Sequence, residues 1–102
     1  MTTFKRISVD QAKQIIDQGD ARIMDVRDQQ SYQRAHIEGA VLLDNNNVGD
    51  FIANTPQDTP LIIYCYHGNS SQGVGQFFAE KGFEQVYSMD GGFEQWRTLY
   101  QP

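Results

Sequence analysis

Short apolar runs alternate with amphipathic segments along most of the chain. The apolar runs predict four strands, at 21–26, 40–43, 59–65 and 84–89. Around and between them, apolar residues recur at helical spacing and predict helices at 8–18, 28–36, within 45–54, at 70–81 and at 93–100. The run Leu61–Tyr64 is apolar at every position, which is typical of a strand covered on both faces.

Capping residues support the limits of two of these helices. Ser8 and Gln11 have the spacing of a capping box, and Gly19 is a natural stop for the helix that they begin. Lys81 lies in the last turn of the helix at 70–81, and Gly82 fits the position just past that turn.

The alternation of strands and helices predicts an α/β fold. We expect one domain over 1–102, with a central, mostly parallel sheet of about five strands and helices on both faces. In such sheets, ligands bind beyond the C-terminal ends of the strands. Asp25, Arg27 and Cys65 all fall at predicted strand ends. These three residues are therefore the first candidates for a functional site.

Composition and charge exclude several kinds of partner. The net charge is −5 and the eight basic residues are scattered along the chain, which argues against binding to nucleic acid or to an anionic membrane surface. No apolar run approaches the roughly 20 residues of a membrane span, and the N-terminal segment has no hydrophobic leader region. A single cysteine cannot form an internal disulfide. We therefore expect a cytoplasmic protein whose thiol stays reduced.

That cysteine, Cys65, ends the clearest predicted strand and precedes a short polar loop and a helix that begins near Ser70. A buried lone cysteine is most often a small hydrophobic residue. Here, however, the N–H groups of the loop and of the helix N-terminus are predicted to converge on the sulfur, and such surroundings lower the pKa of a thiol from about 8.5. Gly68 allows backbone conformations that a side chain would forbid. The pattern favours a reactive thiolate.

Other residues of the C-terminal half are interpreted as packing residues. The inner face of the helix at 70–81 and the core are predicted to include Val74, Phe77, Phe78 and Trp96. Gly73 and Gly75 should each weaken that helix by about 1 kcal/mol relative to Ala. We therefore expect the helix to approach the sheet or the loop closely at these two glycines.

Two other chemistries have little support. Cysteine phosphatases and arsenate reductases also bind an anion in a loop after a strand, but the phosphatase arginine position is Ser71 here, and 66–71 contains no Lys or Arg. Phosphate-ester hydrolysis is poorly served without a guanidinium, whereas neutral amides suit a smaller, singly charged group such as a persulfide on Cys65. No metal site is expected, because His36 and His67 are far apart in sequence and there is only one cysteine.

Four motifs in order resemble the rhodanese family of thiosulfate sulfurtransferases over essentially the whole chain. They are "DVRD" (25–28), "HIEGA" (36–40), "CYHGNSS" (65–71) and "DGGFEQW" (90–96). The amino-acid sequence of the loop is closest to that of the single-domain bacterial rhodanese type that is encoded with glycerol-3-phosphate metabolism genes. Many rhodanese loops carry a basic residue beside the cysteine or at the end of the loop, where this chain has Tyr66 and Ser70 or Ser71. We therefore expect a high KM for thiosulfate.

The resemblance implies a double displacement through Cys65. The thiolate takes the sulfane sulfur of thiosulfate as a persulfide, sulfite leaves, and the sulfur passes to cyanide, to a small dithiol or to thioredoxin. No cofactor is implied. The backbone N–H groups expected to hold the persulfide are those of Tyr66, His67, Gly68, Asn69, Ser70 and Ser71. Two alternatives stay open: a sulfur-relay carrier with a protein donor, and a catalytically silent interaction module.

The remaining candidates are assigned mainly structural roles. The resemblance suggests an ion pair near the end of the first predicted strand, between Asp25 and Arg27, and a hydrogen-bonded scaffold role for His36. His67 either polarises an incoming sulfur oxyanion or is a solvated loop residue. Tyr66 either shapes the mouth of a pocket or covers the loop.

Overall fold

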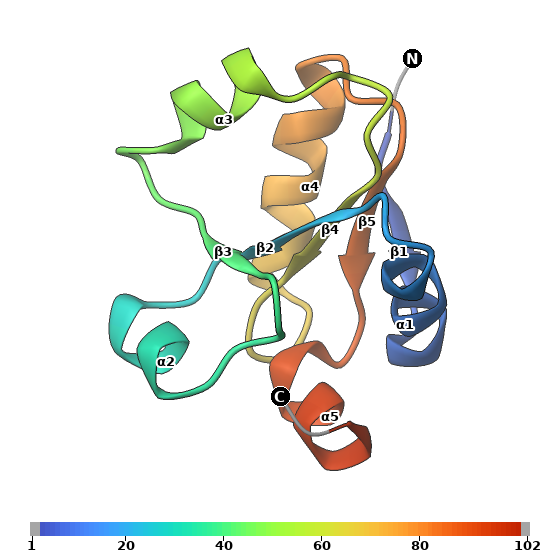
Figure 1. Cartoon of the computed structure of the whole chain (residues 1–102), viewed down its shortest axis with the longest axis vertical. Coiled ribbons are helices and arrows are strands. Elements are labelled where there is room, and N and C mark those ends of the chain that lie inside the picture. The colour runs from blue at the N-terminus through green and yellow to red at the C-terminus, as the bar shows by residue number, and fades with distance from the viewer. Residues whose placement is uncertain (1–2, 101–102) are drawn as a thin grey trace.

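In the computed structural model, which describes residues 3–100, all the strands run parallel in one five-stranded sheet (Figure 1). The strand order is β1-β5-β4-β2-β3. The strands are β1 (Lys5–Ile7), β2 (Arg22–Asp25), β3 (Val41–Leu42), β4 (Leu61–Tyr64) and β5 (Val86–Met89). The predicted α/β class with a parallel sheet is confirmed.

Helices cover both faces of the sheet, as the apolar run of β4 predicts. The helices are α1 (Val9–Asp17), α2 (Gln29–Arg34), α3 (Val48–Asn54), α4 (Ser70–Glu80) and α5 (Gly92–Leu99). Side chains of α1, α2 and α5 pack in one apolar cluster, and those of α3 and α4 pack in a second cluster on the other face. Successive residues of β4 alternate between the two clusters, so the whole strand is buried.

Strand β1 is absent from the sequence prediction. Lys5 and Arg6 are exposed and only Ile7 is buried, so this strand has no hydrophobic pattern to detect. It forms the edge of the sheet, and its place there comes from parallel pairing with β5, about 80 residues further along the chain.

Helix α4 differs from its predicted packing in two respects. Its fully buried face is Ser71, Gly75, Phe78 and Ala79. Phe77 lies off this face and is 39% exposed, so its assignment to the core is wrong, whereas Phe78 is fully buried. A Cβ on Gly75 would lie 3.2 Å from the Phe4 side chain, which confirms close packing there. Gly73 faces open space, and the same expectation for Gly73 is wrong.

The sheet order creates a switch point between β2 and β4. These strands are neighbours, but the chain continues from β2 towards β3 on one side and from β4 towards β5 on the other. The loops after the two strands therefore diverge and leave a crevice at their C-terminal ends, where α/β proteins place their ligands. Asp25 and Arg27 follow one strand and Cys65 follows the other.

Candidate active site

Cys65 directly follows β4, and its residue is only 4% exposed. The chain then turns through Tyr66–Asn69 and enters α4 at Ser70. The first turn of α4 contains no acidic residue, and Asn69 makes no side-chain cap, so no carboxylate of that turn competes for the positive end of the helix. The sequence prediction of a thiol over a helix N-terminus therefore matches the structure.

Two backbone N–H groups donate to the sulfur. The distances to Cys65 Sγ are 3.2 Å from Gly68 N and 3.3 Å from Ser71 N. Among residues 3–100, no hydrogen bond joins Sγ to the N–H groups of Tyr66, Asn69 or Ser70, although the sequence predicts that these groups hold a persulfide. The thiol itself is therefore held by part of the expected set.

A pair of buried hydroxyls extends this arrangement and was missed by sequence reasoning. Ser71 Oγ lies 3.4 Å from Cys65 Sγ and 2.8 Å from Oγ of Ser88 on β5. Both serines are fully buried. A hydroxyl can donate or accept, so Ser71 is able to accept a hydrogen bond from the thiol or, by rotating, to donate one to the thiolate. No signal in the sequence joins Ser71 to a serine 17 positions away.

These contacts change the acidity of the thiol. Burial raises the pKa of Cys65, since it disfavours the charged form. Hydrogen bonds from the Ser71 hydroxyl and from the N–H groups of Ser71 and Gly68, with a smaller contribution from the His67 backbone, oppose burial and outweigh it. The net result is a Cys65 pKa below its ordinary value, which increases the thiolate fraction at neutral pH.

Two glycines allow the loop to adopt this shape. Gly68 has φ +98°, and an added Cβ would lie 3.1–3.2 Å from the backbone of 89–91. Gly92 has φ +58°, and its Cβ would lie 2.4 Å from Tyr66 O and 2.6 Å from Cys65 O. Only glycine accommodates both the conformation and the contact. This gives the "DGG" turn a structural role beyond that of a simple reversal.

The N-terminus of α5 fixes the other side of the loop. Phe93 N donates to Cys65 O at 2.8 Å, and Glu94 N donates to Tyr66 O at 3.1 Å. These are N–H groups of the first turn of a helix, which have no partner within the helix itself. The loop is therefore held at its carbonyl groups by α5 while its N–H groups stay available to the sulfur.

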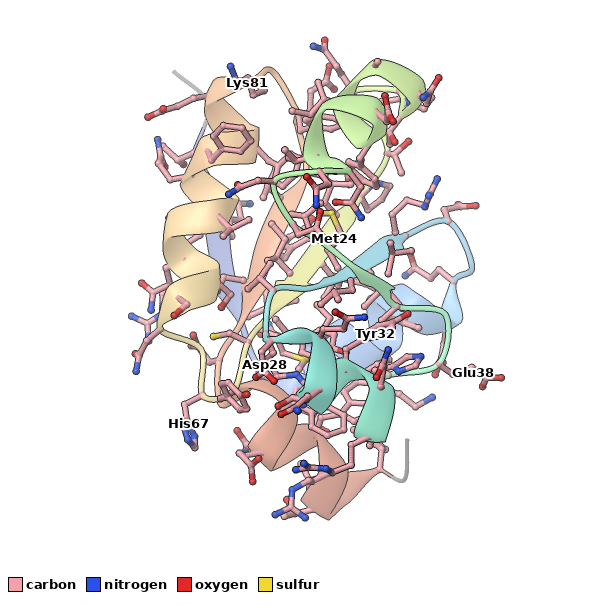
Figure 2. The ribbon with its side chains drawn as sticks, turned by 90° about the vertical axis from the view of Figure 1, so that its left-hand side faces the viewer. Met24, Asp28, Tyr32, Glu38, His67 and Lys81 are labelled. Atoms are coloured by element: carbon pink, nitrogen blue, oxygen red, sulfur yellow. The ribbon has the colours of Figure 1, made fainter. Side chains whose placement is uncertain are left out.

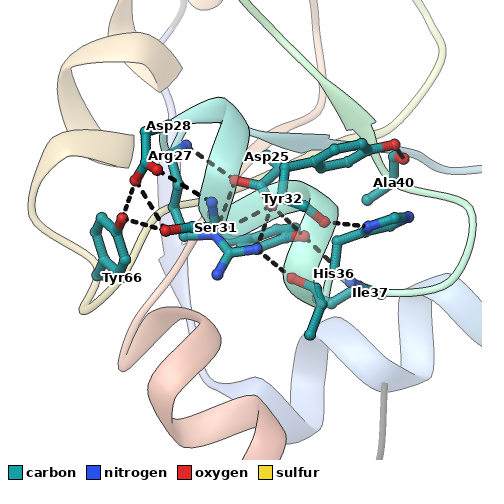
Figure 3. A network of polar contacts seen from close by, with 11 residues as sticks. Asp25, Arg27, Asp28, Ser31, Tyr32, His36, Ile37, Ala40 and Tyr66 are labelled. Carbon is teal, nitrogen blue, oxygen red and sulfur yellow. Dashed lines mark hydrogen bonds and ion pairs between the residues drawn. The ribbon is translucent and has the colours of Figure 1, made fainter.

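The end of β2 carries a buried charge network (Figure 3). Arg27 Nη2 lies 2.6 Å from Asp25 Oδ2, which confirms the expected ion pair. Arg27 also donates to Ala35 O at 2.7 Å, and Tyr64 OH donates to Asp25 Oδ2 at 2.8 Å. Burial lowers the pKa of Arg27, but Asp25 outweighs it, so the pKa lies above its ordinary value. Both charges are satisfied internally.

The other candidates lie around this network. Tyr66 is 39% exposed and its hydroxyl contacts Asp28 and Ser31, the N-cap and third residue of α2 (Figure 3). Hydrogen bonds from Tyr66 and Ser31 hold the pKa of Asp28 below its ordinary range. His67 is exposed and points away from the molecule at the tip of the loop (Figure 2). His36 stacks on Tyr32 and contacts Tyr32 O at 2.7 Å, consistent with a scaffold role.

Residues 3–100 contain neither a metal-binding cluster nor a membrane-spanning helix. No group of three or more His, Cys, Asp or Glu side chains in that range is placed to hold a metal ion. No helix in the same range combines the length and the apolar character needed to cross a bilayer.

Comparison with known proteins places the chain in a family. The model of the rhodanese-like domain matches residues 8–99. The chain is 51% identical over 98 residues to the thiosulfate sulfurtransferase GlpE of Pseudomonas paraeruginosa, with 96% of this chain and 88% of that protein covered. It is also 51% identical over 100 residues to GlpE of Pseudomonas savastanoi pv. phaseolicola, with 98% and 93% covered. A rhodanese-related protein from Thermoplasma volcanium shares the fold, with a TM-score of 0.79 at 19% identity over 97% of this chain and 96% of that one. The chain therefore belongs to the rhodanese family.

Proposed function

We propose that this protein is a thiosulfate sulfurtransferase in which Cys65 carries the transferred sulfur as a persulfide. The observation that carries the proposal is the Cys65 thiol, which receives N–H donors from Gly68 and Ser71 and has a lowered pKa. A thiolate is the form of cysteine that attacks sulfur. The activity printed for relatives about 50% identical over nearly the whole chain supports the same chemistry.

The proposed reaction has two displacements. The Cys65 thiolate attacks the outer sulfur of thiosulfate, the S–S bond of thiosulfate breaks, and sulfite leaves with the electron pair. An acceptor such as cyanide then attacks the outer sulfur of the persulfide, the new S–S bond breaks, and the thiolate is regenerated as thiocyanate leaves. The nucleophile and the leaving groups are anions, so neither step needs a general base.

The loop donors suit both forms of the cysteine. Neutral N–H groups already directed at the sulfur stabilise a thiolate or a persulfide without reorganisation. The loop of 66–71 offers no guanidinium for a dianionic phosphate, and the nearby Arg27 is neutralised by Asp25. We propose His36, Asp25 and Arg27 as structural supports of the site, and a small dithiol or thioredoxin in the cytoplasm as the acceptor.

Thiocyanate formation from thiosulfate and cyanide tests the proposal. We expect turnover by the native protein and loss of turnover in Cys65→Ser. Intact-mass measurement after thiosulfate treatment should show one added sulfur atom in the native protein and none in the variant. Turnover by Cys65→Ser, or a native protein that gains no sulfur from thiosulfate, would refute the proposal.

A sulfur relay with a protein donor uses the same cysteine and differs in the source of sulfur. The name of the relatives favours thiosulfate as the donor. A rate of persulfide formation much higher with a protein persulfide than with thiosulfate would favour the relay.

A further inference from the structure

A small pocket of about 290 Å³ lies beside the Cys65 loop, between α2 and α5. Figure 1 shows these two helices at the same end of the molecule as the loop that follows β4. The residues of the pocket that matter here are Arg27, Arg34, Tyr66, Phe93, Glu94 and Arg97. Its volume is at the lower limit of the roughly 300–1,000 Å³ typical of small-molecule sites. The pocket therefore suits a small molecule better than a protein segment.

The pocket brings together three arginines in an acidic protein, and one of them has no carboxylate partner among residues 3–100. Three of the eight basic residues of a chain with net charge −5 line it, so the basic residues are not scattered in space as they are in sequence. Arg27 is neutralised by Asp25, and Arg97 Nε contacts Glu94 at 3.0 Å. Arg34 pairs with no carboxylate among residues 3–100. Arg34 and Arg97 are both exposed, so their guanidinium groups are accessible to an anion.

Side chains that line the pocket are fixed in place. The Arg27 guanidinium lies 4.2 Å from the centre of the Phe93 ring, forms an ion pair with Asp25 and donates a hydrogen bond to Ala35 O. Tyr66 is held through its hydroxyl by Ser31, at 2.6 Å, and by Asp28 (Figure 3). A pocket whose walls are already ordered loses little conformational entropy on binding.

The position of the pocket restricts which anionic substrate can bind in it while reacting at Cys65. Tyr66 lines the pocket, but Cys65, the preceding residue, does not. In thiosulfate, the sulfur that reacts is bonded directly to the sulfonate, so the charge must stay beside Cys65 when that sulfur is attacked. A molecule that places its charge in the pocket while it reacts at Cys65 needs several bonds between its anionic group and its sulfur. An acceptor thiol with a distant carboxylate meets this requirement.

We propose that Arg34 and Arg97 bind the carboxylate of a small dithiol acceptor while one of its thiols reaches the persulfide on Cys65. This inference rests on the proposed function. The acceptor thiolate attacks the outer sulfur, the Cys65 S–S bond breaks, and the Cys65 thiolate leaves. The second thiol of the acceptor then displaces hydrosulfide and closes a disulfide, so the acceptor is oxidised by two electrons as the sulfane sulfur is reduced to hydrosulfide.

A matched pair of acceptors tests the proposal. Dihydrolipoate and dihydrolipoamide have the same dithiol and differ in a carboxylate against a neutral amide. We expect the native protein to have a lower KM for dihydrolipoate, and the ratio of the two KM values to shift against dihydrolipoate by about tenfold in Arg34→Gln/Arg97→Gln. Arg22→Gln is the control, because it removes a positive charge from an exposed residue at the N-terminal end of β2. Its ratio should equal that of the native protein.

Three results would overturn the proposal: a native protein that does not distinguish the two dithiols, a double variant that keeps the native ratio, or an equal shift in Arg22→Gln. Binding of oxidised lipoate and lipoamide to Cys65→Ser protein, measured by calorimetry, tests the pocket without turnover. One outcome separates the two proposals: thiosulfate adds no sulfur to the native protein, but lipoate still binds more tightly than lipoamide, and this preference requires both arginines. In that case the proposed function is wrong and the proposed pocket is supported. If sulfur is added but that preference is absent, the pocket fails alone.

Discussion

The loops that follow β2 and β4 lie at the same edge of the sheet, but one has a buried ion pair and the other has only neutral hydrogen-bond donors. The β2 end buries a full ion pair, Asp25 with Arg27, and satisfies it with Tyr64 and a backbone carbonyl. The β4 end surrounds Cys65 with neutral donors only. Charges that neutralise each other give rigidity but attract no ligand, whereas uncompensated N–H dipoles leave a positive potential for an anion. The scaffold and the reactive loop are therefore built from different interactions.

The largest effect should come from removing the buried ion pair at the end of β2. Asp25→Ala leaves Arg27 buried without its partner, and we expect the free energy of unfolding to fall by about 3–5 kcal/mol. Asp17→Ala removes an exposed pair with Lys13 and should cost less than about 1 kcal/mol. Denaturant unfolding followed by circular dichroism measures both. Similar losses of unfolding free energy in the two variants would contradict a larger contribution from the buried pair.

The backbone of the loop that follows β4 should be the next most sensitive feature. Gly92→Ala and Gly19→Ala both put alanine at a positive φ, which costs about 1–2 kcal/mol of stability. Only Gly92 would also push a Cβ against the carbonyls of Cys65 and Tyr66, whereas Gly19 faces open space. We expect thiosulfate–cyanide turnover to fall by about 10²-fold in Gly92→Ala. Turnover in Gly19→Ala should stay close to native, and an equal loss in both variants would contradict the role of this contact.

The hydroxyl pair of Ser71 and Ser88 should control the pKa of the thiol. Ser71→Ala removes a donor that lowers the Cys65 pKa, so the pKa should rise and the rate of alkylation by iodoacetamide should begin to increase at higher pH. Loss of a hydrogen bond to a charged group is worth about 1.5–3 kcal/mol, or about 10- to 100-fold in kcat/KM at neutral pH. Ser88→Ala acts only through Ser71, and its shift should be in the same direction and smaller. An unchanged pH profile in both variants would exclude this role.

The smallest effect should come from adding charge to the neutral loop. Ser70 is exposed at the start of α4, so Ser70→Lys should fold normally. We expect its KM for thiosulfate to fall by about threefold to tenfold at low ionic strength, because the loop then attracts a dianion. The gain should disappear in about 1 M salt, where the Debye length is only about 3 Å. An equal KM in native and variant protein at low salt would contradict the explanation of a high native KM.

Much of the fold could be predicted from the sequence because its determinants are local. The capping box of Ser8 and Gln11 forms as expected, and Gly82 ends α4 with φ +100°. The apolar run of β4 is fully buried, and it delivers Cys65 to a strand end before a helix. Each of these features depends on hydrogen bonds or burial within a few residues of one segment.

Most of the features that sequence reasoning missed join distant segments. Strand β1 is defined by pairing with β5 and has no apolar pattern of its own. The Ser71–Ser88 contact links α4 to β5, and the arginine pocket brings together the last turns of α2 and α5. Helical spacing predicts that Phe77 lies on the inner face with Val74 and Phe78, but the contacts of α4 put Ser71 and Gly75 on the buried face instead.

The sequence alone predicts the order of the helices and of strands β2 to β5, the position of the only thiol at the end of a buried strand, and the absence of a cation from its loop. These depend on residue type and on short-range periodicity. Only the folded chain shows which hydroxyl reaches the sulfur, which glycine must approach the loop, and where the arginines gather. Those features depend on how the loop after β4 and the helices pack against one another in three dimensions.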